Sequence, residues 1–205
     1  MAEEQNPATV AEEVARKRPK PGERRIQILQ ALAAMLELPG AERITTAALA
    51  ARLQVSEAAL YRHFASKAQM FEGLIEFIET SVFSLLNQIA DGPHDPIDKL
   101  KRMLLVLLQF AERNPGMARV MAGDALVFEN DRVHQRMNLF FDKVEASLRQ
   151  VLRDGASASA TPSVDAQVQA SVAVSFVIGR LHRFSRSGYK RSPVEHLDAS
   201  LKLMF

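Results

Sequence analysis

The chain has 205 residues, of which 47% are hydrophobic and 24% charged, as is typical of a folded protein of one or two domains. It has no cysteine, which excludes disulfides, a thiolate nucleophile and cysteine-ligated metal sites. No apolar run reaches the length of a membrane span, and residues 1–15 lack the pattern of a signal peptide, so we expect a cytosolic protein.

The positive charge is concentrated near the N-terminus, although the net charge is only +2. Residues 1–15 carry four acids and no lysine or arginine, whereas residues 16–67 carry ten bases and four acids. From residue 68 onward, 16 bases balance 16 acids. This distribution favours a polyanion such as DNA as the partner of the N-terminal part.

Residues 1–21 show no lasting periodicity and predict a disordered tail. Its basic end, residues 16–20, is either a solvated charge cluster or an arm that reaches DNA phosphates or the minor groove. A first helix is expected over residues 22–38, before Pro39-Gly40. Its inner face combines the apolar residues Ile26, Leu29, Leu32, Ala33 and Leu36.

Residues 45–67 predict two short helices around a tight turn. Thr45 or Thr46 can cap the first helix, and Ser56 can cap the second. Val55 is the apolar residue expected to pack between the two helices at the turn. The residues expected to pack inward are Ala47, Leu49, Ala50, Leu53, Ala59, Leu60 and Phe64. This is the layout of a helix-turn-helix, whose second helix enters the major groove of DNA.

A long amphipathic helix follows, roughly over residues 67–90, with an apolar stripe that includes Leu85. Phe77 lies off this stripe. Either a neighbouring helix buries it, or it is an exposed apolar contact for a partner.

The remaining pattern predicts a helix over residues 96–113, a short helix to Gly123 and a long helix over residues 124–153. Residues 155–162 read as a flexible loop. A two-faced apolar helix over residues 164–187 comes next, and a capping box at residues 192–195 opens the last helix. No strand pattern appears, so the expected fold class is all-α.

Catalytic and metal-binding patterns are missing from the sequence. The five histidines form no metal-type pair, and there is no glycine-rich phosphate loop or Gly-x-Ser-x-Gly elbow. We therefore expect no enzyme activity, no cofactor and no metal.

The helix-turn-helix region resembles the amino-terminal signature of the TetR family of DNA-binding proteins. The matching residues are Thr46-Ala47, Leu49-Ala50, Val55-Ser56, Leu60-Tyr61, His63-Phe64 and Lys67. The resemblance implies a DNA-binding domain at residues 22–66 and a helical dimerisation and partner-binding domain at residues 67–205. Gln54 stands where the family usually has glycine, which suits a left-handed turn position.

The same resemblance implies a homodimer that binds palindromic double-stranded DNA. It does not decide whether a higher oligomer forms on the DNA. The residues expected at the DNA are Arg24, Arg25, Thr45, Thr46, Ser56, Glu57, Ala58, Tyr61, Arg62, His63 and Lys67. Those expected between the subunits are Val168, Val172, Phe176, Leu197 and Leu201.

Blocks at residues 43–47, 55–64, 74–79 and 112–116 resemble one branch of the family, the nucleoid occlusion factors. Such a protein, associated with the nucleoid in the cytoplasm, antagonises polymers of the tubulin-like division protein FtsZ while bound to DNA. Phe77, Arg113 and Asn114 are then expected to bind FtsZ. The alternative is a ligand-responsive TetR-type repressor, whose C-terminal helices enclose a small molecule.

Overall fold

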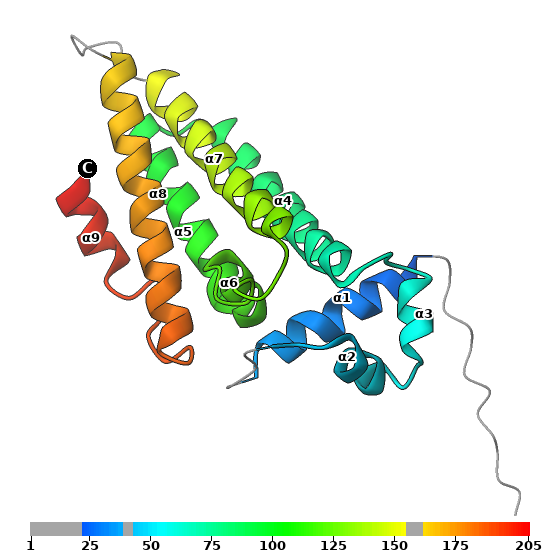
Figure 1. Ribbon diagram of the computed structural model, residues 1–205. Helices are drawn as coiled ribbons and strands as arrows, with labels where there is room; N and C mark the ends of the chain where they lie inside the picture. The colour runs from blue at the N-terminus through cyan, green and yellow to red at the C-terminus, as the bar shows by residue number, and fades with distance from the viewer. Residues whose placement is uncertain (1–21, 39–42, 155–161) are drawn as a thin grey trace, which may run out of the picture.

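The computed structural model describes residues 22–38, 43–154 and 162–205, and all the regular structure in these ranges is helical (Figure 1). The described residues form nine helices: α1 (Glu23–Leu36), α2 (Thr46–Leu53), α3 (Glu57–Tyr61), α4 (Lys67–Ala90), α5 (Pro96–Arg113), α6 (Pro115–Met121), α7 (Asp131–Asp154), α8 (Pro162–Arg186) and α9 (Leu197–Met204). The expected all-α class is therefore confirmed. The predictions for residues 1–21, Pro39-Gly40 and the loop from residue 155 lie outside the described residues.

The long helices α4, α5, α7 and α8 form a bundle, and α1, α2 and α3 form a smaller unit at one end of it (Figure 1). Helix α4 continues from that unit into the bundle, while α6 packs against both α1 and α8. Helix α9 lies on the outer side of α8 (Figure 1). One apolar core extends from Ile28 in α1 to Leu201 in α9, so the two units are packed together.

Helix α7 begins seven residues later than the predicted start at residue 124, because local signals stop and restart the chain there. Gly123 has a φ of +83°, which ends the preceding helix, and the Asn130 side chain accepts a hydrogen bond from the Arg132 N–H. The intervening turn leaves Val127 exposed, although this residue falls within the helix predicted over residues 124–153.

The predicted capping box at residues 192–195 is also wrong. Ser192 Oγ accepts from the Val194 N–H and donates to the Glu112 carboxylate, so it closes a turn against α5. Helix α9 starts only after His196, which has a φ of +53°.

Three predicted inward residues are exposed, namely Ile26, Ala47 and Leu85. The core face of α1 instead runs through Ile28, Leu32, Ala33 and Leu36. Ile26 is two residues from Ile28, which places it on the opposite side of the helix. None of the described helices combines the length and the hydropathy needed to cross a membrane.

Candidate nucleic-acid interface

The turn between α2 and α3 is built by two hydroxyl caps and one left-handed residue. Thr45 Oγ1 accepts from the Ala48 N–H at 3.1 Å, and Ser56 Oγ accepts from the Ala59 N–H at 3.2 Å. Gln54 has φ 55° and ψ 47°, the left-handed conformation that glycine usually provides. The helix-turn-helix geometry is thus kept, at a cost of about 1 kcal/mol for a non-glycine residue.

Helix α3 presents a polar face and buries the other. Leu60 and Phe64 are buried, while Ser56, Glu57, Ala58, Tyr61, Arg62 and His63 are exposed. The Thr46 hydroxyl donates to Glu57 Oε2, and the Tyr61 hydroxyl lies 3.5 Å from Thr46 Oγ1. This small network joins α2 to α3 and orients the Glu57 carboxylate at the exposed start of α3.

Two arginines at the start of α1 make contacts within the protein. Arg25 donates to the His63 carbonyl oxygen and lies over the Phe64 ring, 4.1 Å from its centroid. Arg24 donates to Gln27 Oε1 at 3.0 Å. Arg25 therefore ties α1 to the end of α3, a positioning contact that motif spacing alone does not reveal.

Lys67, at the N-terminus of α4, has an acidic partner inside the molecule. Its Nζ lies 2.5 Å from Glu129 Oε1 in the segment before α7, and 5.5 Å from the centre of the Phe71 ring. The Glu129 side chain is only 8% exposed. A phosphate contact by Lys67 must therefore compete with, or share, this ion pair.

Arg119 and Tyr189 bind the end of α1 from the bundle. Arg119 Nη1 and the Tyr189 hydroxyl both donate to the Leu36 carbonyl oxygen, at 3.0 and 3.2 Å. Burial raises the pKa of Tyr189, which keeps its hydroxyl protonated as a donor. The smaller unit of α1, α2 and α3 is thus fixed to α6 and to the segment after α8.

The residues expected to bind a protein partner lie on α4 and at the end of α5. The Phe77 side chain is 49% exposed, which agrees with the exposed-contact interpretation. Helices α4 and α5 form a hairpin joined by residues 91–95, so the last turn of α5 lies beside the N-terminal half of α4. Arg113 is exposed there, whereas Asn114 Nδ2 donates to the Phe110 carbonyl at 2.7 Å and caps α5.

The residues expected between subunits divide into two groups. Val168 and Val172 are 56% and 47% exposed on the outer face of α8. Phe176 is half-buried beneath the Arg180 guanidinium. Leu197 and Leu201, only 3% and 2% exposed, belong to the core of the protomer, so their placement on an intersubunit surface was wrong. They are buried because the face of α9 that carries them packs against the core of its own protomer.

Two family models match the chain. Residues 28–74 match the bacterial regulatory proteins of the tetR family, and residues 94–205 match the tetracyclin repressor-like C-terminal domain of SlmA-like proteins. The chain is 50% identical over 182 residues to the nucleoid occlusion factor SlmA of Idiomarina loihiensis, covering 88% of this chain and 93% of that one. SlmA of Vibrio cholerae is 50% identical over 177 residues, covering 85% and 90%.

The chain belongs to the SlmA family of nucleoid occlusion factors. These are TetR-family proteins, a family of DNA-binding regulators. Solved structures agree on the fold. A transcriptional regulator from Rhodococcus sp. Rha1 superposes with a TM-score of 0.72 at 21% identity, covering 88% of this chain and 92% of that one. FadR from Bacillus subtilis, in complex with stearoyl-CoA, gives 0.69 at 14% identity, covering 87% and 96%.

For this member of the SlmA family, three exposed arginines complete the candidate DNA surface. Arg43, Arg52 and Arg62 have no ion pair among the described residues. Sequence reasoning assigned only Arg62 to the site. The local excess of positive charge was the available signal for Arg43 and Arg52, since unpaired cations beside a helix-turn-helix can neutralise phosphates.

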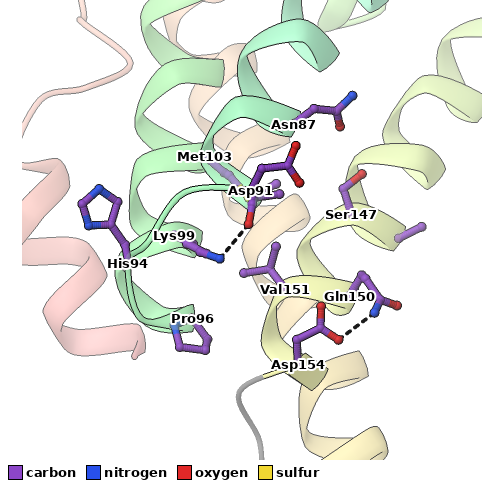
Figure 2. A pocket seen from close by; sticks show the side chains of 12 residues that line it. Asn87, Asp91, His94, Pro96, Lys99, Met103, Ser147, Gln150, Val151 and Asp154 are labelled. Carbon is purple, nitrogen blue, oxygen red and sulfur yellow. Dashed lines mark hydrogen bonds between the residues drawn. The ribbon is translucent and has the colours of Figure 1, made fainter.

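A hollow of about 660 Å³ is lined by the α4–α5 turn, the start of α5 and the end of α7. These segments lie at the end of the bundle farthest from α2 and α3 (Figure 1). Figure 2 shows that Asp91, His94 and Lys99 come from the α4–α5 turn and the start of α5, and that Asp154 comes from the end of α7. Lys99 Nζ donates to the Ala90 carbonyl at 2.6 Å, so this cation is already bound. The lining mixes both signs of charge and indicates no particular ligand for the repressor alternative.

Proposed function

We propose that this member of the SlmA family binds palindromic DNA as a homodimer and, while bound, antagonises FtsZ polymers, so that no division septum forms over the nucleoid. Its place of action is then the cytoplasm, at the nucleoid surface. The exposure of Phe77 on the N-terminal half of α4 and of Arg113 at the end of α5 is the observation that carries the proposal. An aromatic ring and an arginine are the side chains that most often dominate a protein-binding surface.

The same part of the molecule touches the DNA-binding unit, which supports a link between the two activities. Arg113 and Asn114 directly precede α6, and α6 packs on α1 through Gly116 and Arg119. A change in α1 on DNA binding therefore reaches the end of α5 through one short helix. This connection gives a physical reason for a partner site that responds to DNA.

Sedimentation of purified FtsZ polymers with GTP tests the proposal. The full chain is added with and without a duplex selected from a random library for tight binding. We expect the DNA-bound protein to reduce the pelleted FtsZ, and Phe77→Ala and Arg113→Asp to abolish that reduction while dimerisation and DNA affinity stay unchanged.

Two matched controls are available on exposed surface outside the proposed site. Phe128→Ala removes an aromatic ring that is 62% exposed, and Arg102→Asp reverses an exposed charge on α5. Both controls should act as the unchanged protein does. If the pelleted FtsZ stays the same with and without the protein, the antagonism is wrong. A small molecule that releases the DNA would instead support the repressor alternative.

A further inference from the structure

A concave, positively charged surface lies between the C-terminal half of α8, the segment 187–196 and α9. Four cations line it, namely Arg180, Arg183, Lys190 and Arg191, and Glu195 is its one carboxylate. We call this surface the α8–α9 basic hollow. Its volume of about 660 Å³ is within the range of small-ligand sites in proteins.

Three of the four cations have no partner among the described residues. Arg183, Lys190 and Arg191 form no ion pair there, and no hydrogen bond of their side chains is present. The contrast is the α4–α7 contact, where Arg136 and Lys143 both pair with Glu79. The hollow thus gathers positive charge that the protomer leaves uncompensated.

Arg180 is held at the wall of the hollow by three contacts. Its guanidinium donates to the Glu195 carbonyl oxygen and to Ser200 Oγ, and it lies 4.8 Å from the centre of the Phe176 ring. Burial and the nearby charge of Arg183 lower the pKa of Arg180. Like charges held this close repel one another, and a bound anion relieves that repulsion.

The helix dipole explains only part of the cluster. Cations in the last turn of a helix are favoured by its negative end, which accounts for Arg183 and Arg186 in α8. Lys190 and Arg191 lie beyond that helix, and Arg180 lies before its last turn. Their convergence on one hollow calls for another reason.

We propose that the α8–α9 basic hollow binds a small phosphorylated anion of nucleotide size. Guanidinium groups match phosphate oxygens through paired hydrogen bonds, and several of them around one hollow suit a group with two or more negative charges. The volume leaves room for a larger moiety beside the phosphates. A DNA duplex is a poorer fit, because duplexes are bound by protruding elements, and here those are α2 and α3 in the smaller unit (Figure 1).

Isothermal titration of the full-length protein with sodium pyrophosphate and, separately, with ATP tests this site in the absence of DNA and magnesium. We expect both to bind. The double variant Arg183→Gln/Arg191→Gln should lose about tenfold or more in affinity, as expected for charged hydrogen bonds. Tighter binding of ATP than of pyrophosphate would identify a nucleotide as the preferred class.

Two further variants separate this site from a general effect on folding or charge. Arg102→Gln removes an exposed arginine on α5 and should leave both affinities within about twofold, because exposed charges at a distance are screened. Glu195→Gln removes the one carboxylate of the hollow, while its backbone carbonyl still accepts from Arg180. It should increase the affinity for pyrophosphate by about threefold, which a disrupted fold cannot do.

Four results would overturn the proposal. The first is no binding of either anion to the unchanged protein. The second is equal binding by the double variant. The third is dissociation of the double variant into monomers in analytical ultracentrifugation, which would assign the cations to acidic groups of a second copy. The fourth is a double variant that loses affinity only for duplex DNA, while neither it nor the unchanged protein binds pyrophosphate.

Discussion

Gly116 of α6 lies against the Ala33 carbonyl oxygen of α1 with no room for a side chain. A Cβ on residue 116 would be only 2.1 Å from that oxygen and 3.0 Å from the carbonyl carbon. Both are backbone atoms of α1, so they cannot move aside without a shift of that helix. The position therefore requires glycine because of tertiary packing.

Gly116→Ala should lower the free energy of unfolding by about 1–3 kcal/mol, the usual range for overpacking. Urea denaturation measures the loss. Gly179→Ala is the matched control, because a Cβ there meets nothing within 4 Å and alanine favours a helix by about 0.5–1 kcal/mol. Equal destabilisation by both variants would reject the steric explanation.

Glu129→Gln should increase DNA affinity, because it removes the carboxylate that pairs with Lys67. The freed ammonium can then neutralise a phosphate, and the slope of log K against log salt should become steeper by up to about one unit. Fluorescence anisotropy at several salt concentrations gives both quantities.

Lys67→Ala is the companion variant and should weaken binding to all DNA sequences alike, with a shallower salt slope. If Lys67→Ala changed the sequence preference instead, or if Glu129→Gln weakened binding, the assigned phosphate contact would be wrong. Thermal unfolding of both variants checks that the loss of the ion pair leaves the fold intact.

Glu79 should make unfolding dependent on pH. Burial raises its pKa, but hydrogen bonds from Lys143 and Arg136 outweigh burial and hold the pKa below the usual value for a glutamate. A carboxyl group with a lowered pKa stabilises the fold above its unfolded pKa, and this stabilisation is lost as the pH falls through its folded pKa. Glu79→Gln should thus cost about 1–2 kcal/mol at pH 7 and much less in acid.

Urea denaturation of Glu79→Gln and the unchanged protein from pH 7 to pH 3 measures that difference. Glu76→Gln, on the exposed face of the same helix, should change stability little at any pH. A cost for Glu79→Gln that stays constant down to pH 3 would show that the charge of Glu79 is not responsible.

The exposed valines of α8 give a sharp test of the dimer. Val168→Glu/Val172→Glu should produce folded monomers, because both side chains lie on the outer face of the protomer. Leu197→Glu should instead unfold the protomer, since it places a charge in the core. Sedimentation velocity and circular dichroism distinguish these outcomes. A stable dimer of the double variant would move the interface elsewhere.

The sequence alone determined the helix-turn-helix and most of the bundle, because these depend on local signals. Thr45 and Ser56 act as caps as expected, and Gln54 adopts the left-handed conformation that its place in the turn requires. The apolar periodicity of α5 and α7 also matches their buried faces. Such signals lie within one or two helical turns of the residues they control.

Tertiary structure decided which polar side chains are paired within the protomer and which apolar side chains are buried in it. Lys67 and Glu129 are separated by 62 residues, and Arg25 and His63 by 38, so no local pattern predicts their contacts. Periodicity placed Leu197 on an apolar face, but only the packing of α9 shows that this face closes on its own protomer. The basic hollow has the same origin, because α8, α9 and the segment between them bring its cations together only in the folded protein.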